Sequence, residues 1–293
     1  MITVNNIRFS YGDKEVIKGM SFESVDNTVI SILGPNGTGK TTFLKCLCGV
    51  HKPSEGEILV DGVDITKLKG RELAKKIAYV PQSVPASRMS VFDSVLIGRK
   101  PYIEWSTRSE DLDKVSDVLD KLGMSHLSLK YMNEISGGEF QKAQIARAIV
   151  QEPSVLVLDE PTNNLDISNQ HRTMHMIMDL VRSKGMCTIM TMHDINLAVH
   201  YSDRFLFLKD GQAVAYGGTE IITEELIKDV YGIESDIIYH RGVPLVVPKY
   251  SSKYEHAEHH HHDHTEHHHD HDIHDHLVIS KDDEWESGGD PFE

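Results

Sequence analysis

The sequence predicts an α/β fold in which helices cover a mostly parallel sheet. Short apolar runs alternate with amphipathic stretches over the first 250 residues, a pattern typical of such a sheet. Each run is rich in branched apolar residues and bounded by Gly, Pro or a charged residue, which favours strands buried on both faces. The three clearest runs are residues 29–33, 155–158 and 188–190.

Two amphipathic segments between these runs are predicted helices. Residues 111–122 place Leu112, Val115, Leu119 and Leu122 at helical spacing, and residues 139–150 repeat alanine and isoleucine in the same way. We expect these helices to belong to a helical insertion at about residues 88–150.

Length and composition limit the classes of function. The 293 residues allow about two compact units, and 30 Lys+Arg against 45 Asp+Glu give a net charge of −15. That charge disfavours a nucleic-acid partner, because binding phosphates needs a basic surface. The cysteines, Cys46, Cys48 and Cys187, form neither an even disulfide framework nor a four-ligand zinc site, so we expect them reduced and packed.

No secretory signal and no apolar run of about 20 residues is evident, so any membrane role is expected to be peripheral. After residue 250 the composition becomes almost entirely polar, and 12 of the 19 histidines lie between His256 and His276. Such a segment cannot offset its ordering entropy by burial. We therefore predict a folded domain over residues 1–250 and a disordered His/Asp/Glu-rich tail over residues 251–293.

A glycine-rich phosphate-binding loop is the strongest motif. It matches G-x-x-x-x-G-K-[ST], follows a predicted strand and opens the predicted helix 42–48, which is the context that the motif requires. Backbone N–H groups and the helix start would cradle phosphates, Lys40 would reach the β- and γ-phosphates, and Thr41 would hold Mg²⁺. The residues predicted to bind the nucleotide here are Gly34, Pro35, Asn36, Gly37, Thr38, Gly39, Lys40, Thr41 and Thr42.

Two carboxylates follow the apolar run 155–158. Asp159 would hold Mg²⁺ at the carboxyl edge of the sheet, and Glu160 would orient or deprotonate an attacking water. Together with the loop they predict a P-loop NTPase (RecA-like) that binds ATP and Mg²⁺.

A third motif, Ser136-Gly137-Gly138-Glu139, narrows the class. It is a capping box with two glycines, and so a second anion-binding helix start. With FQKAQIARAIVQEP and the acidic strand behind it, the sequence resembles the ATP-binding subunits of ABC transporters, whose signature is L-S-G-G-Q. Glu139 departs from the usual Gln and adds a negative charge. The resemblance covers about residues 1–240 and implies an antiparallel β subdomain beside the parallel core.

The resemblance also implies further site residues. Tyr11 would stack on adenine, Gln82 would contact Mg²⁺ or the water, and His193 would contact the γ-phosphate. Asn164-Leu165-Asp166 resembles the D-loop that crosses a dimer interface, with Asn164 in place of the usual small residue. Glu160, His193, Gln82 and Lys40 are thus the expected catalytic residues.

In this family the signature of one subunit caps the ATP held by the other, so the resemblance implies a dimer, here with a second copy or a related subunit. Two multi-span permease subunits and, indirectly, an extracytoplasmic solute-binding protein would complete the transporter, with this chain bound peripherally at the cytoplasmic face of the membrane. The stretch 90–102 resembles the insertion of importers of ferric siderophores, haem and cobalamin. The alternatives are a soluble ABC ATPase in repair, translation or cofactor assembly, and a metal-buffering protein.

The composition of the tail also concerns the choice between an importer subunit and a metal-buffering protein. Imidazoles interleaved with carboxylates suit Ni²⁺, Co²⁺ or Zn²⁺. The candidate ligands are His259, His260, His261, His262, His267, His268 and His269. The tail either buffers or senses the transported metal, for which a nickel or cobalt complex is a further candidate, or is a solubilising segment. The methionines at 174–178 and 186–192 are expected to be packing residues, and no metal site is assigned to them.

Overall fold

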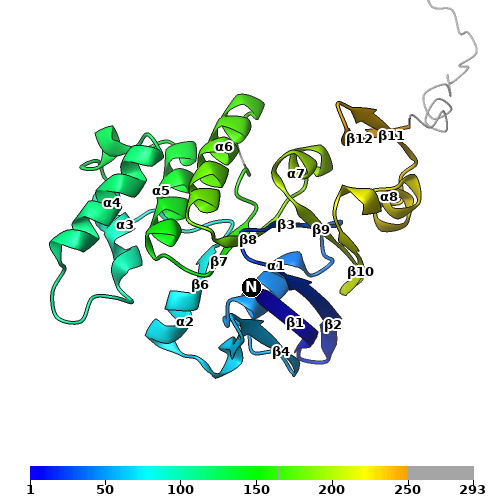
Figure 1. Ribbon diagram of the computed structural model, residues 1–293, viewed down its shortest axis with the longest axis horizontal. Coiled ribbons are helices and arrows are strands. Elements are labelled where there is room, and N and C mark those ends of the chain that lie inside the picture. Colours follow the sequence, from blue (N-terminus) through cyan, green and yellow to red (C-terminus); the bar gives the residue numbers. More distant parts are fainter. Residues whose placement is uncertain (164, 250–293) are drawn as a thin grey trace, which may run out of the picture. The chain divides into compact units, whose positions relative to one another are not determined.

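The computed structural model describes residues 1–163 and 165–249 (Figure 1). Asn164 and the tail, including its seven candidate histidines, lie outside the described residues. A central six-stranded sheet has the order β10-β9-β3-β8-β7-β6, in which all neighbours are parallel except the edge pair β10 and β9. Its strands are β3 (Val29–Leu33), β6 (Ile77–Val80), β7 (Val155–Asp159), β8 (Cys187–Thr191), β9 (Arg204–Lys209) and β10 (Gln212–Gly217).

Alternating side chains of the central strands enter two different cores. On β3, Val29 and Leu33 belong to one core cluster, while Ile30 and Ile32 belong to the other. This alternation follows from the two-residue period of a strand. The predicted strands 29–33, 155–158 and 188–190 are confirmed, since they lie within β3, β7 and β8 and are buried throughout.

A separate four-stranded antiparallel sheet has the order β2-β1-β4-β5. Its strands are β1 (Ile2–Tyr11), β2 (Lys14–Ser24), β4 (Glu55–Val60) and β5 (Val63–Asp64). It shares a core cluster with α1 (Lys40–Leu47) and one face of the central sheet. The α/β class with an additional antiparallel sheet is therefore confirmed.

Helices pack on the other face of the central sheet and beyond its β6 edge. In Figure 1, α3, α4 and α5 lie together, and α5 contacts both of the other two helices and β6. The helices after α1 are α2 (Gly70–Lys76), α3 (Val91–Leu96), α4 (Ser109–Lys121), α5 (Gly137–Val150), α6 (Ile167–Ser183), α7 (Ile195–Tyr201) and α8 (Glu224–Tyr231). A hairpin of β11 (Ser235–His240) and β12 (Val243–Pro248) contacts α7 and α8.

The predicted helices 111–122 and 139–150 correspond to α4 and α5, but one predicted core residue is wrong. Leu112 is 40% exposed, whereas Val115, Leu119 and Leu122 are buried as expected. The buried position in the first turn of α4 is taken by Asp111, which accepts a hydrogen bond from Arg99 Nε at 2.9 Å. A polar residue thus occupies the position where a hydrophobic one was expected, because the chain supplies a buried cation to pair with it.

The stretch that resembles an importer insertion has clear structural roles. Ser90 caps α3 by accepting a hydrogen bond from the Asp93 N–H at 3.0 Å. A Cβ on Gly98 would lie 2.1 Å from the carbonyl oxygen of Arg147, so only glycine allows this approach to α5. Arg99, 3% exposed, pairs with Asp111 and Glu152.

The expected packing of the sulfur-containing residues is confirmed. Met174, Met178, Met186, Met190 and Met192 are buried in the core cluster shared with α5. Cys46, Cys48 and Cys187 are buried free thiols, and burial raises the pKa of Cys46 to about 12. Within residues 1–163 and 165–249, none of the helices has the length and apolar character needed to cross a membrane.

Candidate nucleotide site

The loop between β3 and α1 forms a cradle of backbone groups. Gly34 has φ 146°, and a Cβ there would lie 2.2 Å from the carbonyl oxygen of Leu208, so no other residue fits. Gly39 is left-handed with φ 98° and precedes α1, which begins at Lys40, two residues earlier than predicted. The first N–H groups of a helix have no acceptor within it, so this helix start is a favourable place for phosphates.

Lys40 supplies the positive charge of the loop. Its side chain is buried, and Nζ donates to the carbonyl oxygens of Gly34 at 2.6 Å and Pro35 at 3.0 Å. Burial lowers the pKa of Lys40, and the carboxylates of Glu160 and Asp159 oppose that effect. The ammonium group is therefore enclosed by the loop and close to both predicted acidic residues.

Asp159 lies at the end of β7 and is 1% exposed. Its carboxylate accepts hydrogen bonds from Thr191 Oγ1 at 2.7 Å, Thr41 Oγ1 at 3.3 Å and the Tyr79 hydroxyl at 3.3 Å. The hydroxyl of Thr41 and the carboxylate of Asp159 are hard oxygen donors, which suit Mg²⁺. Thr191 and Tyr79 were not predicted to contact Asp159. Their positions, at the end of β8 and one residue before the end of β6, could have indicated this contact.

Glu160 contacts two other predicted site residues, Gln82 and His193. Its carboxylate accepts a hydrogen bond from Gln82 Nε2 and contacts His193 Nε2 on the other oxygen. Asn163 Nδ2 donates to the same carboxylate at 3.1 Å, and Thr191 accepts the Glu160 N–H at 2.9 Å. Because Gln82 and His193 are 78 and 33 residues away in sequence, only the fold brings them to this carboxylate.

Tyr11 lines the same surface hollow as the loop. The hollow, about 730 Å³, also includes Lys40, Thr41 and Glu160. Asn36, Gly37, Gly39 and Thr42 complete the predicted residues that line it.

His51 supports Tyr11 and was not predicted. Its Nε2 lies 2.7 Å from the Tyr11 hydroxyl, and its ring stacks on Phe9 with centroids 4.9 Å apart. No sequence motif indicated this contact, because 40 residues separate His51 from Tyr11.

The predicted capping box at Ser136 is confirmed. Ser136 accepts from the Glu139 N–H, and Glu139 Oε2 accepts from the Ser136 N–H and hydroxyl, both at 2.8 Å. The hydrogen bond from the Ser136 N–H, followed by the one from its hydroxyl, holds the pKa of Glu139 below its usual value. Glu139 is thus a charged group that engages the Ser136 hydroxyl.

The signature residues lie away from the phosphate loop of the same chain. Ser136, Gly138, Glu139 and Asp166 line a second hollow of about 430 Å³, which shares no lining residue with the first. Asp166 caps α6 by accepting the Asn169 N–H at 2.8 Å. Gly137 instead borders a hollow with Gln82 and Glu160.

Comparison with known proteins gives the family. Residues 17–163 match the ABC transporter family. The chain is 48% identical over 248 residues to an uncharacterized ABC transporter ATP-binding protein of Methanocaldococcus jannaschii, covering 85% of this chain and 98% of the relative. It is 35% identical over 248 residues to the ferric enterobactin transport ATP-binding protein of Escherichia coli, covering 83% and 92%.

Its structure is similar to that of a chain from an inward-facing ABC transporter assigned to the metal-chelate type. The TM-score is 0.73 at 29% identity, over 85% of this chain and 97% of the other. The chain therefore belongs to the ABC transporter family and is an ATP-binding ATPase subunit.

Proposed function

We propose that this chain, bound at the cytoplasmic face of the membrane, hydrolyses ATP to drive the import of a metal chelate, such as a ferric siderophore or haem, through separate permease subunits. The observation that carries the proposal is the convergence of Gln82, Glu160 and His193 beside a loop with a buried lysine. The names of relatives supply the substrate class, since they include importers of ferric enterobactin and haemin.

The residues have distinct roles in this proposal. Lys40 and the loop N–H groups hold the β- and γ-phosphates, while Thr41, Asp159 and Gln82 provide oxygen ligands for Mg²⁺. Mg²⁺, when bound, neutralises charge on the transferred phosphoryl group. Glu160 accepts the proton of the attacking water, and His193 holds the Glu160 carboxylate in place.

The separation of the two hollows supports a dimer. Within one chain, the signature hollow with Ser136 and Asp166 shares no lining residue with the hollow that contains Lys40. A second subunit placed head to tail would bring the first N–H groups of its α5, which follow Ser136, to the γ-phosphate held by Lys40. A homodimer completes two such sites with a single set of motifs.

Purification of the full-length chain from native membranes tests the transporter assignment. The bound proteins are identified by mass spectrometry, with Glu160→Gln as the bait that retains ATP and Lys40→Ala as the matched control. We expect multi-span permeases at equal stoichiometry, and uptake of a ferric chelate that is lost in both variants. A set of soluble partners without a permease would instead indicate a non-transport ATPase.

A further inference from the structure

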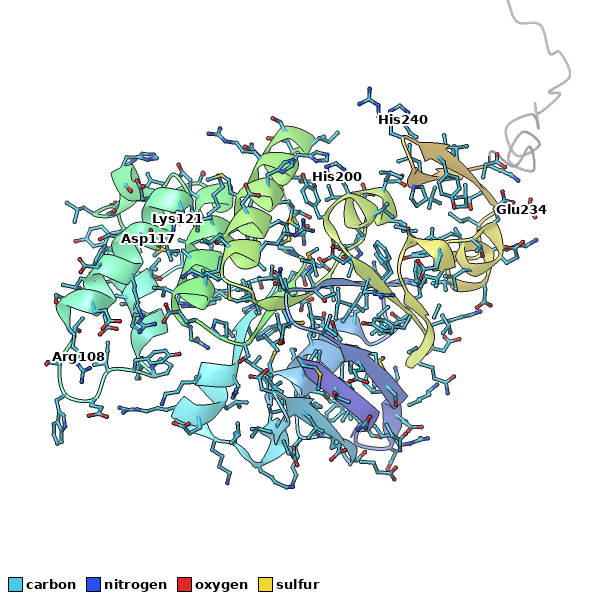
Figure 2. All side chains as sticks on the ribbon, viewed as in Figure 1. Arg108, Asp117, Lys121, His200, Glu234 and His240 are labelled. Atoms are coloured by element: carbon cyan, nitrogen blue, oxygen red, sulfur yellow. The ribbon has the colours of Figure 1, made fainter. Side chains whose placement is uncertain are left out.

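Three exposed histidines meet on the outer surface between α6 and α7. His171 and His175 are four residues apart on α6 and therefore lie on the same face, one turn from each other. His200 comes from the last turn of α7 and is labelled in Figure 2. These three side chains, named here the histidine cluster, are not part of the nucleotide site.

The His200 ring lies near the rings of both α6 histidines. The centroid of His200 lies 5.8 Å from that of His171 and 6.0 Å from that of His175. Two imidazoles bound to one tetrahedral ion, with N–metal distances of about 2 Å, have centroids about 5 Å apart. The His200 ring thus needs to approach each partner by less than about 1 Å, which exposed side chains achieve by small rotations about χ1 and χ2.

Tyr201 determines which nitrogen of His171 is available. Its hydroxyl lies 3.2 Å from the backbone carbonyl oxygen of His171 and is hydrogen-bonded to His171 Nδ1 at 2.9 Å. Because Nδ1 is engaged by Tyr201, Nε2 is the nitrogen of His171 that can bind a metal ion. A hydrogen bond to the other ring nitrogen is the usual way in which proteins orient a metal-binding histidine.

We propose that His171, His175 and His200 form a binding site for a divalent transition-metal ion, with Zn²⁺ or Ni²⁺ as the fitting chemistry. Neutral imidazoles are preferred ligands of these ions, and a histidine pair at positions i and i+4 of a helix presents two of them on one face. As they lie, no group of three or more His, Cys, Asp or Glu side chains in the described part of the chain could hold a metal ion. Binding therefore includes the rotation of the exposed rings, with Tyr201 holding the first ligand.

The two helices that carry the histidine cluster both begin next to predicted site residues. α6 begins directly after its cap, Asp166, in the segment that resembles the D-loop, and α7 begins two residues after His193. An ion held by both helices would connect the segments that follow these two residues. The metal site itself does not depend on the proposed transport function.

Chemical footprinting of the full-length chain tests the site residue by residue. The protein is treated with diethylpyrocarbonate at increasing concentrations of zinc sulfate, and modification of each histidine is measured by peptide mass spectrometry. Zinc should protect His171, His175 and His200 together at one half-saturation concentration. The exposed His126 should stay reactive as an internal reference. The tail histidines lie on other peptides, so their protection is measured separately from that of the cluster.

The variant His200→Ala separates a shared ion from three independent histidines. We expect the zinc concentration that half-protects His171 and His175 to rise at least about tenfold, because one metal ligand is lost. His240→Ala, which removes an exposed histidine on β11, should leave that concentration unchanged. Unchanged protection in His200→Ala, or no protection where zinc already protects the tail histidines, would overturn the proposal. ATP binding by both variants establishes that they are folded.

Discussion

Replacement of Glu160 by Gln tests the role assigned to the central carboxylate. The side chains are the same size, and each contact has a counterpart: the amide oxygen can accept from Gln82 and Asn163, and the amide nitrogen can donate to His193. The local structure should therefore persist, while the group that accepts a proton from water is lost. General-base catalysis contributes roughly 10²–10⁴-fold, so the barrier to hydrolysis should rise by about 3–5 kcal/mol.

Nucleotide binding should respond in the opposite direction. The Glu160 carboxylate acts on Lys40 electrostatically, so it also repels the phosphates that Lys40 attracts. Removing this negative charge should leave ATP affinity unchanged or increase it, and ATP should convert the variant into a stable dimer. Single-turnover hydrolysis, equilibrium binding of ATP and size-exclusion chromatography with ATP measure the three effects. A hydrolysis rate within tenfold of the wild type, in a variant that binds ATP normally, would refute the assignment of Glu160 as the base.

Three further predictions concern charged side chains elsewhere in the fold. Lys40→Ala should lose ATP affinity itself, measured by equilibrium binding, because the ammonium group that meets the phosphates is removed. Arg99→Ala should cost about 3–5 kcal/mol of unfolding free energy by leaving Asp111 buried without its cation, which corresponds to a fall in Tm of roughly 6–20 °C. Burial raises the pKa of Asp61, but hydrogen bonds from Lys76, Ser154 and the N-terminus outweigh it and lower that pKa to about 2. Since the folded pKa is depressed, the stabilisation is complete above about pH 4 and is lost as pH falls towards 2; Lys76→Met should reduce this acid dependence in denaturation curves.

Matched variants separate these effects from general damage. Lys121→Ala removes the exposed partner of Asp117, with which it forms an ion pair of 2.8 Å, and should change the unfolding free energy by less than about 1 kcal/mol. Both residues are labelled in Figure 2. An equal loss of Tm in Arg99→Ala and Lys121→Ala would contradict the role of burial. Lys40→Ala with unaltered ATP affinity, or Lys76→Met with unaltered acid dependence, would contradict the other two assignments.

A structural feature was predictable from the sequence where its interacting residues are close together in the chain. The phosphate loop is a contiguous motif whose glycines have local conformational reasons, so its place between a strand and a helix was predictable. The same holds for the capping box at Ser136, which is closed within four residues. Long-range contacts carry no such local signal, which is why Thr191 and His51 escaped prediction.

Asp111 shows a second reason why burial could not be predicted fully from the sequence. Hydrophobic periodicity indicates that Leu112 is buried, but in the structure Asp111 is the buried residue. Its carboxylate pairs with Arg99, which is buried as well. Periodicity treats every charged residue as exposed and cannot detect a cation supplied from another element.

The sequence by itself determined the family, the phosphate loop, the order of the motifs and the chemical type of each site residue, because these depend on short segments with fixed backbone requirements. Only the tertiary structure decided which of them meet. The strand order β8-β7-β6 places the carboxyl ends of three parallel strands side by side, so that His193, Glu160 and Gln82, which follow them, converge. Strand order is set by packing of the whole sheet and is not encoded in the local pattern of any one strand. The histidines of α6 and α7 lie together for the same reason. Their helices pack against each other, although the residues are about 30 positions apart in the sequence.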